Sequence, residues 1–117
     1  MTGREQTAGE SAPALAGGET FVPSFDYGAR MSALALSFPS LRQADGLAPW
    51  EPERFARWMR SGAPGHGAKC AGQFLLSVWN PSTRWKGGRF DLHEALAIWD
   101  EAHRAAFLAW ARAPWWP

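Results

Sequence analysis

The fold is decided by residues 91–112, which read DLHEALAIWDEAHRAAFLAWAR. At 100° per residue, nine mostly apolar side chains of this stretch fall within an arc of roughly 140°: Leu92, Ala95, Leu96, Trp99, Ala102, His103, Ala106, Phe107 and Trp110. Asp91 followed by Glu94 has the spacing of a capping box, with aspartate in place of serine or threonine. Pro114 ends the pattern. The stretch therefore predicts one amphipathic helix over 92–112.

Two shorter helices are predicted upstream. Pro52 suits a first helical position and precedes apolar residues at helical spacing, which indicates a helix over about 52–61. A complete apolar stripe predicts a second helix over 67–79, before Asn80-Pro81, and consists of Ala71, Phe74, Leu75, Val78 and Trp79. Around residues 31–38, helix formers favour a short helix over a strand. The predicted fold class is all-α, a small three- to four-helix orthogonal or bundle-like domain.

The N-terminal part of the chain has a different composition. Residues 1–28 are rich in glycine, serine and threonine and contain few large apolar side chains before Phe21. Such a segment cannot bury enough surface to offset its ordering entropy. We therefore expect residues 1–28 to be a disordered or weakly docked arm and 29–117 to be a single helical domain, within the size of one domain.

Composition narrows the class of protein. The single cysteine, Cys70, excludes an intrachain disulfide and fits a reducing compartment. Neither an apolar signal segment near Met1 nor a membrane-length apolar run is present, so a cytoplasmic protein without membrane contact is expected. Abundant Ala, Gly, Arg, Pro and Trp, with only two lysines, indicate the codon bias of a GC-rich bacterial or phage genome.

The net charge of +1 conceals a strongly basic middle. Residues 51–90 carry seven basic and two acidic side chains, a balance of +5, whereas each flanking segment has a balance of −2. Either the acidic last helix neutralises the middle within the fold, or a basic face is free for a polyanion or an acidic partner. The candidate polyanion-binding residues are Arg54, Arg57, Arg60, Arg84, Lys86 and Arg89. No phosphate-loop spacing accompanies them.

Eight tryptophans are an unusual number for this length. Four of them, at positions 58, 79, 99 and 110, fall on inward helical faces and are expected in the core. Trp85, Trp115 and Trp116 lie outside these faces. They are candidate partner-binding residues, because exposed aromatic side chains are enriched at binding hot spots. The alternative is that they fold back onto the core.

No catalytic, metal or cofactor motif is recognisable. His66 and Cys70 share a helical face, but zinc needs further ligands, so a buried free cysteine and no metal are expected. His103 lies within the apolar arc. It is expected to be a core histidine held by one hydrogen bond, and the alternative is a general base oriented by a carboxylate such as Asp100. No nucleophile can be assigned to it from spacing.

The first functional hypothesis is a non-enzymatic protein-binding module, an accessory, regulatory or inhibitory partner of a larger bacterial or phage machine. The alternative is a small nucleic-acid-binding module that uses the basic loop around Trp85. Its weakness is the net charge, which is far below the basic excess of dedicated binders. An enzyme of unknown class is the third hypothesis.

Overall fold

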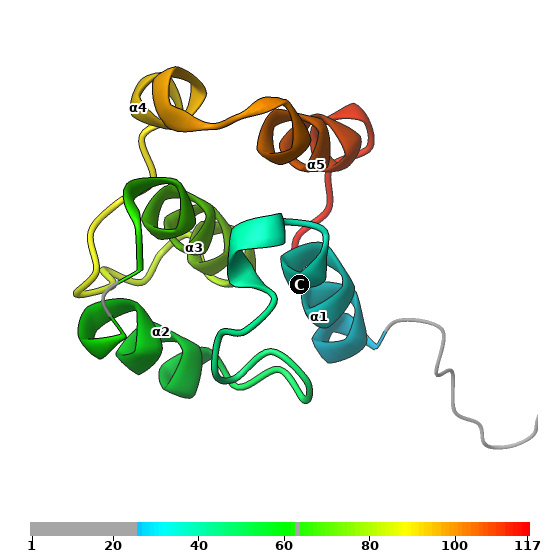
Figure 1. The fold of residues 1–117 in the computed structure, drawn as a ribbon. Coiled ribbons are helices and arrows are strands. Elements are labelled where there is room, and N and C mark those ends of the chain that lie inside the picture. The colour runs from blue at the N-terminus through cyan, green and yellow to red at the C-terminus, as the bar shows by residue number, and fades with distance from the viewer. Residues whose placement is uncertain (1–25, 63) are drawn as a thin grey trace, which may run out of the picture.

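The computed structural model describes residues 26–62 and 64–117, and Figure 1 shows their arrangement. They form five α-helices, one 3-10 turn and no strand: α1 (Tyr27–Leu36), η1 (Pro39–Leu41), α2 (Pro52–Ser61), α3 (His66–Trp79), α4 (Leu92–Ile98) and α5 (Glu101–Arg112). The predicted all-α fold class is confirmed. Within the described ranges, no helix combines the length and the apolarity that a bilayer span requires.

Residues 26–28, which the sequence assigned to the arm, cap and begin helix α1. Asp26 is the N-cap of α1, where its carboxylate accepts a hydrogen bond from the backbone N–H of Ala29 at 3.0 Å. Residues 26–28 therefore belong to the helical domain. The rest of the predicted arm, residues 1–25, lies outside the described residues.

Helix α3 is the centre of the domain. It contacts α1, η1, α2 and α4, and in Figure 1 it lies between α2 on one side and α4 with α5 on the other. Because neighbours cover several of its faces, burial extends beyond the predicted stripe to residues such as Cys70 and Leu76. Gly72 allows α2 to approach closely, since an added Cβ would lie 1.9 Å from the Met59 sulfur.

The single helix predicted over 92–112 is wrong, because the chain forms two helices that meet at Trp99 and Asp100. Trp99 ends α4 with extended backbone angles (φ −66°, ψ 139°). Asp100 is the N-cap of α5 and accepts a hydrogen bond from the backbone N–H of His103 at 2.9 Å. A short acidic side chain that bonds to the backbone in this way stabilises a new helix start. Periodicity did not detect the break, since the apolar spacing continues across it.

Trp99 lies at the centre of the aromatic core. Its ring centroid is 5.5 Å from that of Phe38 and 5.9 Å from that of Phe107. Its indole N–H donates to the Gly67 carbonyl at 3.0 Å. With 2 % of its surface exposed, Trp99 connects the segment after α1, the start of α3 and the α4–α5 junction.

We expect Trp99→Ala to cost about 3–5 kcal/mol of folding free energy, because it removes a buried ring and leaves a cavity. This is a large share of the roughly 5–15 kcal/mol typical of a domain. Ile98→Ala is the matched control, since Ile98 is the neighbouring residue and 42 % exposed. Urea unfolding followed by circular dichroism measures both. A Trp99→Ala midpoint equal to that of Ile98→Ala would contradict the central role of the indole.

We expect the thermal midpoint to fall in the order wild type, Asp100→Asn, Asp100→Ala, because asparagine retains the capping acceptor and alanine does not. Hydrogen bonds from His103 hold the pKa of the Asp100 carboxyl below its ordinary 3.8. The carboxylate therefore stabilises the fold above that ordinary value, and its contribution is lost as the pH falls through the lowered one. The difference between wild type and Asp100→Asn should shrink on acidification. A difference that grows toward acidic pH would contradict this assignment.

Candidate functional site

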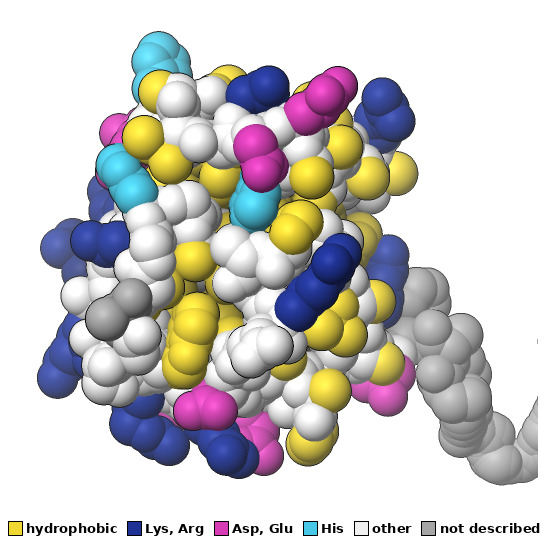
Figure 2. Space-filling model, viewed as in Figure 1, with side chains coloured by type: hydrophobic (Ala, Val, Ile, Leu, Met, Phe, Trp, Pro, Cys, Tyr) yellow, Lys and Arg dark blue, Asp and Glu magenta, His cyan; other side chains and the backbone are white. Residues whose placement is uncertain are grey.

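A groove of about 290 Å³ lies between α2 and the loop that follows α3. Four cationic side chains line it, Arg57 and Arg60 from the helix and Arg84 and Lys86 from the loop, together with Trp85. We call this hollow the basic groove. Figure 2 shows Lys and Arg gathered along the left and lower-left margin of the molecule, the side on which α2 lies in Figure 1.

The other two candidate polyanion-binding residues lie outside the basic groove. Arg89 lines an adjoining hollow of about 410 Å³, which shares Arg84 and Trp85 with the groove. Arg54 lines neither hollow and forms an exposed ion pair with Glu51 at 3.7 Å. Four of the six candidate cations therefore line the basic groove. Arg89 lines the adjoining hollow, and Arg54 lines neither.

No carboxylate of α4 or α5 forms an ion pair with a cation of the basic groove among the described residues. Glu94 is hydrogen-bonded to His66, and Asp100 is bonded to His103 at 2.7 Å. Within residues 26–62 and 64–117, the four groove cations have no carboxylate partner, and Glu53 is the one acidic residue that lines the groove. The described part of the chain therefore matches the alternative of a free basic face.

The three candidate partner-binding tryptophans do not form one patch. Trp85 lies in the basic groove, half-buried, with its ring packed against the core. Trp115 lies against α1, where the Arg30 guanidinium is 4.3 Å from its ring centroid, and Figure 1 shows the C-terminal end returning to this helix. Trp116 is 51 % exposed. The terminal pair therefore divides into one docked and one exposed ring.

A hydrogen-bonded relay connects Ser40, His103 and Asp100. The Ser40 hydroxyl is 2.7 Å from His103 Nε2, and His103 Nδ1 is 2.7 Å from Asp100 Oδ1. Because the Ser40 backbone N–H also donates to Nε2, at 3.4 Å, this nitrogen is the acceptor and Nδ1 carries the proton toward the carboxylate. The buried His103 has two side-chain partners instead of the single one expected. Spacing could not reveal Ser40, which lies 63 positions upstream.

The relay borders a cleft of about 360 Å³. Ser40, Asp100 and His103 line it together with Gly65 and Gly67 at the start of α3. The first backbone N–H groups of a helix have no intrahelical acceptor, and Gly65 provides no side-chain cap. The Asp100 side chain is 69 % exposed, which leaves its carboxylate in contact with solvent.

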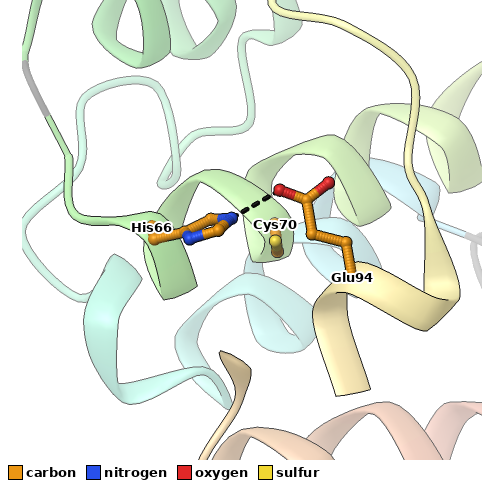
Figure 3. A group of neighbouring side chains, drawn as sticks. All are labelled: His66, Cys70 and Glu94. Carbon is orange, nitrogen blue, oxygen red and sulfur yellow. Dashed lines mark hydrogen bonds and ion pairs between the residues drawn. The ribbon is translucent and has the colours of Figure 1, made fainter. Parts of the chain in front are cut away.

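A second cluster joins α3 to α4, as Figure 3 shows. His66 and Cys70 lie one turn apart on α3, and Glu94 comes from the first turn of α4. One potential ligand atom of each residue lies within 4.8 Å of the other two. Burial, followed by the charge of Glu94, raises the pKa of the Cys70 thiol above 9.0. The sequence suggested His66 and Cys70 by their spacing, whereas Glu94 joins them only because α4 packs on α3.

The basic groove, the relay cleft and the His66–Cys70–Glu94 cluster lie in two regions of the domain. The basic groove shares no lining residue with the relay cleft. The relay cleft and the His66–Cys70–Glu94 cluster are neighbours, because Gly65 and Gly67 flank His66 in the chain.

No protein-family model, curated protein or solved structure matches this chain.

Proposed function

We propose that this protein is a non-enzymatic binding module for an acidic segment of a partner protein. The observation that carries the proposal is the basic groove, whose four cations have no carboxylate partner among the described residues. Exposed ion pairs contribute about 0.2–1 kcal/mol each, so several acting together, with apolar contact from Trp85, support specific but reversible binding. Such a module suits an accessory or regulatory subunit of a larger bacterial or phage machine, in the cytoplasm that the lone cysteine favours.

An acidic protein segment fits the basic groove better than a nucleic acid does. Glu53 lies among the cations, and a nucleic acid carries a charge on every phosphate, whereas a peptide can place an uncharged residue opposite this carboxylate. The Trp85 indole nitrogen is buried and its ring is partly packed against the core, so it offers a partial apolar contact rather than a fully exposed ring on which a base can stack. The net charge of +1 also provides little long-range attraction for a polyanion.

The test is binding of a fluorescent peptide rich in glutamate and leucine, measured by anisotropy at about 0.15 M salt. We expect the triple change Arg57→Ala, Arg60→Ala and Lys86→Ala to weaken binding about tenfold, because it removes roughly 1–2 kcal/mol of ion pairing. Arg54→Ala is the matched control, since Arg54 lies on the same helix, is exposed and is outside the groove. It should leave the affinity unchanged.

Single- and double-stranded oligonucleotides form the competing arm of the same experiment. Tighter binding of DNA or RNA than of the peptide would show that the basic groove recognises nucleic acid instead of an acidic protein segment. In that case the log–log salt dependence would have a slope of about −0.7 to −0.9 per neutralised phosphate. Equal effects of Arg54→Ala and of the triple change would show that attraction is nonspecific, and the proposal would fail.

Ester hydrolysis is the second candidate function, and the Ser40–His103–Asp100 relay is the observation that favours it. In the reaction, Ser40 Oγ would attack an ester carbonyl while His103 Nε2 takes the hydroxyl proton. The alkoxide would leave with that proton, and water activated by His103 would then release the acid and regenerate Ser40. This function ranks second because the carboxylate is solvent-exposed and stabilises an imidazolium less well than a buried one.

Labelling with a fluorophosphonate probe tests the relay. We expect the probe to attach to Ser40, and His103→Gln to abolish labelling, because Ser40 then has no base. Ser37→Ala is the control, since Ser37 is exposed and its hydroxyl donates to the Leu34 backbone carbonyl rather than to a histidine. Mass spectrometry locates the adduct. An unlabelled Ser40 in folded wild-type protein would assign the relay a purely structural role.

A further inference from the structure

The Glu94 carboxylate does not complete the capping box that its spacing predicted. Asp91 does accept a hydrogen bond from the backbone N–H of Glu94, at 3.1 Å. In a complete capping box the glutamate would return to the N-cap backbone, but here it bonds to His66 on α3. Its charge therefore lies between two helices, directly beside the Cys70 thiol, as Figure 3 shows.

The donor atoms of this cluster match the spacing around a single small ion. Zinc binds sulfur at about 2.3 Å, imidazole nitrogen at about 2.0–2.1 Å and carboxylate oxygen at about 2.0–2.2 Å, which places such donors roughly 3–4 Å apart. His66, Cys70 and Glu94 present one such atom each, all within 4.8 Å of one another. His66 and Cys70 lie one turn apart on α3, a spacing that places both side chains on the same face of the helix.

We propose that His66, Cys70 and Glu94 bind one divalent transition-metal ion, with Zn²⁺ as the ion that the donor set favours. Thiolate and imidazole ligands select zinc over magnesium and calcium, which prefer oxygen donors. The His66 and Glu94 side chains are 50 % and 47 % exposed, so an ion can enter from solvent. Three protein ligands leave a fourth position for water, the pattern of an open rather than a closed zinc site.

Binding of the metal ion would also stabilise the packing of α4 against α3. Ala95 is the one residue of this seven-residue helix that is buried, so apolar packing holds α4 weakly. An ion shared by α3 and Glu94 adds a link at the first turn of α4. Its formation releases the Cys70 thiol proton to solvent, and the proton shared by His66 Nε2 and Glu94 moves to the other ring nitrogen, so that Nε2 and the carboxylate each bind the metal in place of their hydrogen bond.

The test is titration of the metal-free full chain with Co²⁺, followed by displacement with Zn²⁺. We expect one Co²⁺ per chain, a near-ultraviolet thiolate-to-metal band and a higher melting temperature with Zn²⁺. Cys70→Ser should remove the thiolate band. Glu94→Gln and His66→Gln should each weaken Co²⁺ binding about tenfold or more. Because both of these positions are exposed, their variants should keep wild-type circular dichroism without metal, which keeps the test informative if Cys70→Ser unfolds.

His93→Ala is the matched control. His93 is exposed, lies next to Glu94 on α4 and is not part of the cluster, so its loss should not change Co²⁺ affinity. Two results would overturn the proposal: a wild-type protein that shows no thiolate band at millimolar Co²⁺, or Glu94→Gln and His66→Gln variants that bind as tightly as wild type. A loss of binding in His93→Ala equal to that in His66→Gln would assign the ion to another site.

Discussion

The burial of the Trp99 indole is the interaction on which the rest of the structure depends. Its N–H reaches the Gly67 carbonyl at the start of α3, while its ring packs on Phe38 after α1 and on Phe107 in α5. Gly67 follows His66 in the chain, and Asp100 follows Trp99. The same contact therefore positions the relay on one side and the His66–Cys70–Glu94 cluster on the other. A small domain with one aromatic centre can in this way assemble two polar sites from distant segments.

Acidic residues serve local roles in this fold, which explains why the charge asymmetry of the sequence survives folding. Asp26, Asp91 and Asp100 each cap a helix N-terminus, and Glu94 is bonded to His66. These positions are favourable because carboxylates there satisfy backbone N–H groups and oppose the positive helix end. Among the described residues, no C-terminal acid forms an ion pair with a cation of the basic groove.

Local signals predicted more of this structure than long-range ones could. The predicted helix over about 52–61 coincides with α2, and that over 67–79 differs from α3 by one residue, because proline and Asn80-Pro81 mark helix ends through backbone sterics. The break at Asp100 was missed, since an aspartate inside an apolar period resembles an exposed helical residue. The cations on α2 were recognised as candidates from composition alone. Ser40 as the partner of His103 and Glu94 as the partner of His66 could not be, because these pairs form by packing across 63 and 28 positions.

Helix α2 forms the wall between the basic groove and the relay cleft. Arg57 lines the groove, and its neighbour Trp58 lines the cleft on another face of the same helix. A partner in the groove could reach the relay only by moving α2. That movement is opposed by the close packing of Met59 on Gly72, where even a methyl group would not fit between the two helices. Because this contact leaves no space between the two helices, α2 is held in place against α3, and the basic groove and the relay cleft are separate surfaces with no lining residue in common.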